Sequence, residues 1–230
     1  MGRNDQSRCS FNCRRDGSII KSLVIWGCGG HGREVLHLCE QIGIEVMGFL
    51  DERPEYKGQI IDDIPVLGDL PDISSLQEKV RIVCAGVGSP RLKKRLVEKT
   101  KKSGFQFAET LVHPSVFMSK RNRLGVGNVI CEGTILTTNV VIENFVIINR
   151  SVNISHDDRI EDYVTIAPGV QIAGNVTIQE GAYIGIGSSI REKTTIGPWS
   201  VIGGGSFVKE DVPEQTLYAG VPAKFKKNLL

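Results

Sequence analysis

The sequence predicts an α/β domain in the first half of the chain and an all-β parallel β-helix in the second half. Two observations support this fold class. An apolar strand, a glycine-rich turn and a helix follow one another after residue 21, and a branched aliphatic residue recurs at every sixth position from Leu124 to Val208. With 230 residues, the chain has room for two small domains.

Residues 1–20 have no apolar periodicity, and we interpret them as a flexible leader. They are polar and charged, unlike a signal peptide, and no apolar run in the chain approaches the ~18 residues of a membrane-spanning helix. We therefore expect no membrane insertion and a cytoplasmic location.

The six cysteines lack paired metal-type spacing, and several lie in apolar stretches, so we expect buried free thiols in a reducing compartment and no metal site. Cys9 and Cys13 leave a metal or redox pair as an alternative, although two cysteines alone cannot fill a zinc shell. The net charge of +2, without a recurring basic block, gives no reason to expect nucleic-acid binding.

The N-terminal domain, residues 21–110, is predicted to contain half of a Rossmann-type unit. Its expected elements are strands at residues 23–26, 46–50 and 80–85 and helices at residues 33–42 and 90–103. The segment 51–70 is rich in charge, glycine and proline, and we interpret it as a flexible loop over a nucleotide.

Three glycines between the first strand and the first helix, Gly27, Gly29 and Gly32, have the G-x-G-x-x-G spacing. Such glycines let backbone N–H groups approach a phosphate at a helix N-terminus, where the helix dipole favours negative charge. Asp51 lies about twenty residues further along the chain, at a position where an acidic residue commonly binds the ribose or the base of a nucleotide. The alternative is that the glycines only make tight turns. Because the chain before the repeat is short, we expect a site for one nucleotide rather than a dinucleotide.

The second domain, residues 111–212, is predicted to be the β-helix. Its in-phase aliphatic positions are Leu124, Ile130, Leu136, Ile142, Ile148, Ile154, Ile160, Ile166, Ile172, Ile178, Ile184, Ile190, Ile196, Ile202 and Val208. A six-residue period matches neither a helix nor an alternating strand, and it is typical of hexapeptide coils with three hexapeptides per turn. The strands of a β-sandwich would come at irregular spacing of about 8–12 residues. The final segment, residues 213–230, is either a cap on the open end or a solvated basic tail.

His156 is the strongest catalytic candidate. It lies two positions after the inward Ile154, so it should project from a corner of the prism, and Asp157 and Asp158 follow it. A carboxylate can orient a histidine and stabilise the imidazolium that forms when it accepts a proton. The alternative is a surface histidine in an acidic patch. Asp158 also occupies a position that is small or β-branched in most other hexapeptides.

Taken together, these motifs resemble a known family. The matching segments are Val24 to Gly32, Phe49 to Glu52, Ala85 to Gly88, Ile166 to Gly169, Ala173 to Val176 and Ala219 to Lys224. They resemble the left-handed β-helix acyltransferases with an N-terminal Rossmann-like domain, which include nucleotide-aminosugar N-acetyltransferases and sialic-acid O-acetyltransferases. The resemblance implies a homotrimer in which acetyl-CoA lies between neighbouring prisms and is transferred directly to the amino group of a nucleotide-linked amino sugar, in bacterial glycan or O-antigen biosynthesis.

The resemblance also implies roles for individual residues. His156 would be the general base, paired with Asp157, and the Gly174 N–H would be the oxyanion donor. The implied substrate-binding residues are Gly29, His31, Asp51, Glu52, Gly88 and Asn149, and the implied residues along the cofactor path are Gly174, Ile186, Gly187 and Gly204. One position departs from the pattern, because several relatives have a second active-site histidine where this chain has Thr165.

Four alternatives remain open. The acyl acceptor could be a sugar oxygen, as in sialic-acid O-acetylation. Transfer could pass through Cys131 in a ping-pong route. The chain could be a non-catalytic nucleotide-sugar-binding scaffold that uses the prism to trimerise, or a dinucleotide oxidoreductase.

Overall fold

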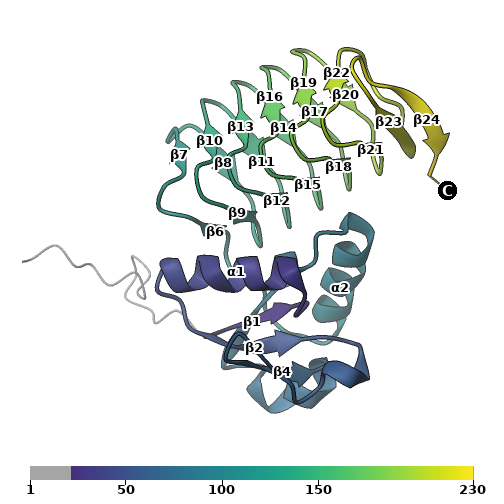
Figure 1. Cartoon of the computed structure of the whole chain (residues 1–230). Coiled ribbons are helices and arrows are strands. Elements are labelled where there is room, and N and C mark those ends of the chain that lie inside the picture. Colours follow the sequence, from purple (N-terminus) through teal and green to yellow (C-terminus); the bar gives the residue numbers. More distant parts are fainter. Residues whose placement is uncertain (1–21, 230) are drawn as a thin grey trace, which may run out of the picture.

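Two domains of different architecture lie side by side in the computed structural model, which describes residues 22–229 (Figure 1). The first is an α/β sheet domain and the second is a prism of short parallel strands, as the sequence predicts. The expected leader, residues 1–20, lies outside the described residues, and so do Cys9 and Cys13.

The N-terminal domain is built on a five-stranded sheet in the order β3-β4-β2-β1-β5. The strands are β1 (Ser22–Trp26), β2 (Val46–Leu50), β3 (Ile60–Ile61), β4 (Ile64–Gly68) and β5 (Val80–Val83), the helices are α1 (Gly30–Gln41) and α2 (Pro90–Lys102), and the 3₁₀ helices are η1 (Pro54–Tyr56), η2 (Leu70–Leu76) and η3 (Cys84–Gly86). The central strand β1 pairs in parallel with β2 and β5. The turns after these three strands therefore meet at one edge of the sheet, where ligands bind in open α/β folds.

The interpretation of residues 51–70 as a flexible loop is wrong. This segment contains η1, β3 and β4, and β4 extends the sheet by pairing in parallel with β2 through Phe49 and Val66. Val66 is buried, and Ile61 pairs with Ile64 in the short β3–β4 hairpin. The segment is polar on average, but it contains one apolar stretch, which pairs with the free edge of strand β2. This tertiary pairing makes the stretch a strand although the composition of the segment is typical of a loop.

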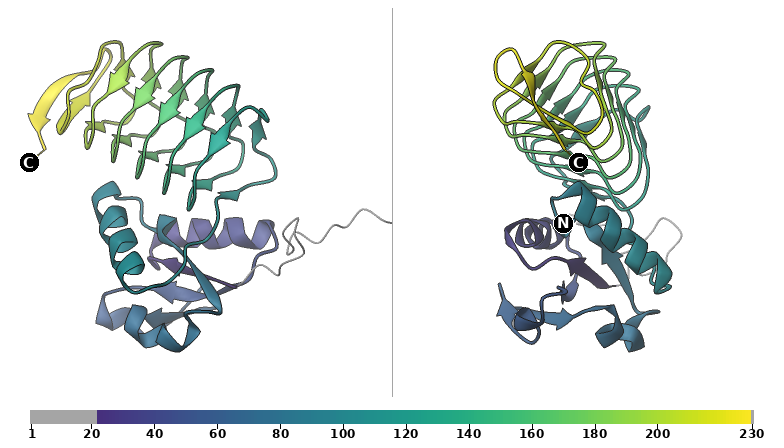
Figure 2. Two further views of the ribbon diagram at one scale, coloured as in Figure 1. Left: turned by 180° about the vertical axis from the view of Figure 1, so that it is seen from behind. Right: turned by 90° about the vertical axis from the view of Figure 1, so that its right-hand side faces the viewer.

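The C-terminal domain is a parallel β-helix of two-residue strands (Figure 2). They are β6 (Leu111–Val112), β7 (Phe117–Met118), β8 (Arg123–Leu124), β9 (Val129–Ile130), β10 (Ile135–Leu136), β11 (Val141–Ile142), β12 (Ile147–Ile148), β13 (Asn153–Ile154), β14 (Arg159–Ile160), β15 (Thr165–Ile166), β16 (Gln171–Ile172), β17 (Thr177–Ile178), β18 (Tyr183–Ile184), β19 (Ser189–Ile190), β20 (Thr195–Ile196), β21 (Val201–Ile202) and β22 (Phe207–Val208). Leu136 pairs with Ile154, and Ile154 pairs with Ile172. One coil therefore contains three hexapeptides, as predicted.

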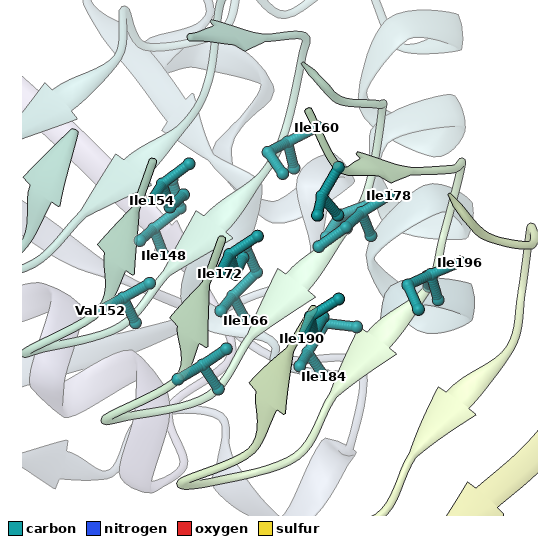
Figure 3. Close-up of a cluster of buried hydrophobic side chains, with 14 of the residues drawn as sticks. Ile148, Val152, Ile154, Ile160, Ile166, Ile172, Ile178, Ile184, Ile190 and Ile196 are labelled. Carbon is teal, nitrogen blue, oxygen red and sulfur yellow. The ribbon is translucent and has the colours of Figure 1, made fainter. Parts of the chain in front are cut away.

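The in-phase aliphatic residues fill the centre of the prism, stacked coil upon coil (Figure 3). From Ile130 to Val208 every one of them is buried, and only Leu124 near the open end is half-buried. Full burial of such a side chain contributes about 1.5–3 kcal/mol, so the stacked repeat contributes substantially to the stability of this domain. The first coil comprises β6, β7 and β8, so the β-helix begins two hexapeptides before Leu124.

The corners of the prism have a regular backbone conformation. From Leu124 to Ile202, the residue three positions after each inward aliphatic has a positive φ, as at Asn139, Asp157 and Asn175 (φ 59°, 62° and 60°). Asparagine, aspartate and glycine tolerate this left-handed conformation better than other residues. Asp157 therefore occupies a corner position that the coil geometry defines, directly after His156.

Helix α1 lies between the N-terminal sheet and the β-helix (Figures 1 and 2). Apolar residues of both domains share one buried cluster, which includes Leu36 from α1 and Val129 and Ile147 from the β-helix. From α2, the fully buried Lys93 donates from Nζ to the carbonyl oxygen of Val164 (3.1 Å) and contacts Thr165 Oγ1 (3.0 Å). These contacts fix how the two domains are oriented.

Strands β23 (Thr216–Ala219) and β24 (Lys224–Asn228) form a hairpin that continues one face of the prism. β23 pairs in parallel with β21, and Tyr218 and Ala223 pack against the apolar core. Most of the segment 213–230 is thus ordered and covers part of the last coil.

Candidate active site

His156 lies at the corner between β13 and β14 with more than half of its side chain exposed. Its Nδ1 is 2.9 Å from Asp157 Oδ2, and the other carboxylate oxygen accepts a hydrogen bond from Asn139 Nδ2 (3.1 Å). The hydrogen bonds from His156 and Asn139 lower the pKa of Asp157. An ionised Asp157 accepts a hydrogen bond from the Nδ1–H group, and this assigns the tautomer in which Nε2 carries the lone pair and is the basic nitrogen.

The imidazole packs against Gly174 in the following coil. A Cβ built on Gly174 would stand 2.5 Å from Cε1 and 2.6 Å from Nε2 of His156, so no other residue leaves room for this ring position. Within the described part of the chain, the Gly174 N–H has no hydrogen-bond acceptor, whereas its neighbours Ala173 and Asn175 donate to the backbone. A free N–H therefore lies beside the basic nitrogen, as an oxyanion donor requires.

Asp158 points into the prism, unlike the two residues before it. It is almost fully buried, Oδ1 accepts a hydrogen bond from the Val176 N–H (2.7 Å), and no partner for Oδ2 occurs among residues 22–229. Burial raises the pKa of Asp158 to about 7. The departure from a small residue at this position thus places a buried carboxyl group with a pKa near neutrality under the corner that carries His156.

A cavity of about 410 Å³ opens at the edge of the N-terminal sheet where the turns after β1, β2 and β5 meet. The structure brings five sequence-predicted residues together in its lining, namely Gly29, His31, Asp51, Glu52 and Gly88. Arg53 and Arg95 also line it, and sequence reasoning missed both. Nothing in the local sequence distinguishes these arginines from other surface cations.

Close packing explains part of the glycine motif. A Cβ at Gly32 would lie 1.9 Å from the Gly27 carbonyl oxygen, and one at Gly86 would lie 2.2 Å from the Trp26 carbonyl oxygen. A Cβ at Gly29 would meet nothing within 4 Å. Gly32 and Gly86 are thus required by packing of the helix and strands. Packing does not require a glycine at position 29. Gly29 is the N-cap residue of α1, and because it has no side chain, the N–H groups at the start of the helix have no side-chain cap.

The two acids of the cavity are already paired with cations. Asp51 is bound by Arg53 through Nε and Nη2 (both 2.8 Å). Burial alone would raise the pKa of Asp51, but hydrogen bonds from Arg53 and Cys28 outweigh it and lower the pKa to about 2. Glu52 pairs with Arg95 (2.5 Å) and Lys99 (2.7 Å). The acidic side chains that line this cavity are therefore neutralised by neighbouring cations before any ligand binds.

His31 links this cavity to the β-helix. Its Nδ1 is 3.1 Å from one carboxylate oxygen of Glu34, and the other oxygen is 2.8 Å from Arg150 Nη1. His31 Nε2 is buried, and no partner for it is found among residues 22–229. An orphaned buried nitrogen in a cavity wall indicates a missing hydrogen-bond partner, such as a bound ligand.

The remaining predicted residues lie at another corner, between the face that contains β12, β15 and β18 and the face that contains β13, β16 and β19. Asn149 is buried there, and its Nδ2 donates to the Ile166 carbonyl oxygen (3.0 Å). Ile186 is 62% exposed, and a Cβ at Gly204 would stand 3.0 Å from Ile186 Cγ2. Within one chain, Asn149, Ile186, Gly187 and Gly204 are thus separated from the His156 corner.

Thr165 lies in neither group, because it is buried under α2 with its hydroxyl against Lys93. Cys131 is also buried, and burial raises the pKa of its thiol to about 12. A thiol that stays protonated is a poor nucleophile, which argues against the ping-pong alternative. Cys28, Cys39, Cys84 and Cys131 are free and buried, as expected for the described cysteines.

Between residues 22 and 229, no group of three or more His, Cys, Asp or Glu side chains is arranged to hold a metal ion. The same residues contain no helix that is long and apolar enough to cross a membrane.

Comparison with known proteins assigns both domains to the same class. The PglD N-terminal domain family matches residues 22–100, and the bacterial transferase hexapeptide family, with six repeats, matches residues 175–210. No curated protein matches the chain significantly. These two matches, one in each domain, define a hexapeptide-repeat transferase with a PglD-type N-terminal domain.

Several solved structures match almost the whole chain. PerB from Caulobacter crescentus, solved in complex with CoA and GDP-perosamine, is 30% identical with a TM-score of 0.82, covering 90% of this chain and 98% of PerB. The acetyltransferase domain of PglB from Neisseria gonorrhoeae, in complex with acetyl coenzyme A, is 31% identical with a TM-score of 0.82, covering 90% and 100%. WeeI from Acinetobacter baumannii is 28% identical with a TM-score of 0.80, covering 89% and 99%. The chain belongs to the family of left-handed β-helix sugar N-acetyltransferases with an N-terminal Rossmann-like domain.

Proposed function

We propose that the protein is an acetyl-CoA-dependent N-acetyltransferase that acts on the amino group of a nucleotide-linked amino sugar. The observation that carries the proposal is the His156–Asp157 pair at a prism corner, with the ring held over Gly174. PerB, with bound CoA and GDP-perosamine, and the PglB domain, with acetyl coenzyme A, support the two co-substrates by similarity.

Direct transfer accounts for the geometry of this corner. The sugar amine attacks the thioester carbonyl carbon while His156 Nε2 accepts the amine proton, and Asp157 stabilises the resulting imidazolium. The carbonyl oxygen becomes an oxyanion that accepts a hydrogen bond from the Gly174 N–H; losing a donor of this kind costs ~2.7–4 kcal/mol. Collapse of the intermediate breaks the carbon–sulfur bond, and the imidazolium returns its proton to the CoA thiolate.

The cavity of the N-terminal domain is the proposed nucleotide site. The N-terminus of α1 has no side-chain cap and no acidic residue in its first turn, so its N–H groups favour an anion. A diphosphate there would also supply the hydrogen-bond partner that His31 Nε2 lacks. Gly29, Asp51, Glu52 and Gly88 would form the rest of this site.

A homotrimer is the proposed assembly. The catalytic corner with His156 and the proposed cofactor path with Ile186 and Gly204 lie at different corners of one prism, so a neighbouring prism is needed to bring such corners together. The face between these corners exposes Phe117, Ile135 and Phe207, as an interaction surface would. Asn149 would then position the sugar at the domain junction. The role in bacterial glycan biosynthesis and the cytoplasmic location stay predictions.

A ligand panel tests the proposed function. UDP-, GDP- and dTDP-linked amino sugars are added with and without acetyl-CoA, and both the melting temperature and acetyl transfer are measured. A ligand at ~100 times its Kd stabilises by about 2.7 kcal/mol, which is readily detected. Stabilisation by one nucleotide sugar and by acetyl-CoA, together with product formation, is expected. A shift with NAD alone would favour an oxidoreductase, and binding without transfer would favour a scaffold.

A further inference from the structure

A charged depression adjoins the catalytic corner and has no role in the proposed mechanism. It has a volume of about 590 Å³ and is lined by Arg121, Arg123, Asn139, Val141, Asp157, Asp158 and Arg159. Because Asp157 and Asn139 belong both to this lining and to the hydrogen-bond chain of His156, the depression is continuous with the site of acyl transfer.

The strand register of the β-helix fixes the distance between two of the arginines in this depression. Val141 pairs with Arg123 on one side and with Arg159 on the other, so these residues are consecutive on the outer surface of β8, β11 and β14. Neighbouring strands lie ≈ 4.7–4.9 Å apart, which places the two arginine backbones about 10 Å apart. The shorter Val141 side chain forms an apolar floor between them, with room for a small group.

The charges of this depression are not balanced. Arg159 is paired with Glu143 (2.7 Å), and the two oxygens of Asp157 are taken by His156 and Asn139. Arg121 and Arg123 are exposed, and neither has an acidic partner among the described residues. The ionised carboxylate of Asp157 offsets one of these two guanidinium charges, so the depression keeps an excess positive charge, whereas the arginines of the nucleotide cavity are paired.

We infer that Arg121 and Arg123 form an anion subsite for the acceptor, which binds an acidic group of the nucleotide amino sugar while the amine lies at His156 Nε2. This inference rests on the proposed function. Guanidinium groups bind phosphate and carboxylate oxygens in the same two-pronged geometry. The anion is therefore either the sugar-side phosphate of the diphosphate, whose other phosphate lies at the N-terminus of α1, or a carboxylate on the sugar. In either case the subsite anchors the acceptor close to its reacting amine.

The test compares Arg121→Gln/Arg123→Gln with Lys101→Gln/Lys102→Gln, which removes two positive charges from the exposed end of α2. Charge-assisted hydrogen bonds are worth ≈ 1.5–3 kcal/mol, so the KM for the acceptor should rise at least about tenfold in the arginine variant. The KM for acetyl-CoA should not change, and the lysine variant should resemble the wild type.

Two acceptor classes identify the anion. A raised KM for carboxylate-free UDP- or GDP-linked 4-amino-4,6-dideoxy sugars assigns the subsite to the diphosphate. A raised KM confined to a nucleotide-linked amino sugar with a C6 carboxylate assigns it to the sugar acid. An unchanged acceptor KM overturns the inference. So does an effect on acetyl-CoA that disappears with acetyl-dephospho-CoA, because the subsite would then bind the 3′-phosphate of CoA.

The two proposals fail in different ways. If the wild-type protein acetylates none of these acceptors, the proposed function is rejected and the subsite with it. If the wild type is active and the arginine variant has an unchanged acceptor KM, only the subsite is rejected.

Discussion

The imidazole of His156 rests on the backbone of Gly174, where a Cβ would come within 2.5 Å of the ring. The two residues belong to successive coils, and the Asn175 N–H donates to the His156 carbonyl oxygen (3.0 Å) across the same step. Coil stacking thus positions the proposed base and the proposed oxyanion donor together.

His156→Ala should lower kcat at least about a hundredfold with little change in either KM, because general-base assistance is worth about 10²–10⁴-fold. Residual activity should persist, since substrate alignment is retained. Steady-state kinetics with both co-substrates measure this. His37→Ala, which removes an exposed histidine of α1, is the matched control. Near-wild-type turnover of His156→Ala would reject the base assignment.

Gly174→Ala should lower kcat because the added methyl group displaces the imidazole. The loss should be at least about tenfold, and it should depend on His156. In a His156→Ala background, the same change at Gly174 should have much less effect, since the clashing ring is gone. A double-mutant cycle on kcat measures this coupling. Equal losses in both backgrounds would show that position 174 acts independently of the ring.

Asp158→Asn should change how stability depends on pH. The pKa of Asp158 rises from 3.8 to about 7 on folding, so its contribution is fully present below pH 4 and is lost as the pH rises to about 7. The upper limit of this loss is about 4 kcal/mol. Thermal unfolding of the wild type between pH 4.5 and 8 should show this loss of stability, and the loss should be smaller in Asp158→Asn.

Asn is an appropriate replacement because Asn122 and Asn128 occupy equivalent inward positions with both side-chain ends hydrogen-bonded. Parallel pH curves for the wild type and Asp158→Asn would mean that the carboxyl group is ionised throughout. Asp157→Asn serves as a control, because its exposed carboxylate has a lowered pKa.

Lys93→Met should alter stability in alkaline solution. Complete burial lowers the pKa of Lys93, so the folded state prefers the neutral amine. The unfolded chain then binds more protons, and wild-type stability should rise with pH towards the ordinary lysine pKa near 10.5. Methionine fills similar space without a charge, so the variant should lack this rise. Melting temperatures from pH 7 to 10 test it, with Lys101→Met as the surface control.

The β-helix could be predicted almost completely, because each inward aliphatic is set by a local rule that repeats every six residues. The same phase placed His156 at a corner. The left-handed corner position of Asp157 could also have been found, since glycine or asparagine recurs at that position in Gly133, Asn139, Gly169, Asn175, Gly181, Gly187 and Gly205. The strand–glycine–helix order likewise predicted the first half of the N-terminal sheet.

The sequence by itself determined the repeat, the two-domain order and the identity of the proposed base, because these depend on spacing along one chain. Only the tertiary structure decided that residues 51–70 add strand β4 to the sheet and that Lys93 buries its amine against Thr165. It also decided that Arg121 and Arg123 share a depression with Asp157. Such contacts join residues from different coils or domains, and no local pattern encodes which distant surfaces will meet.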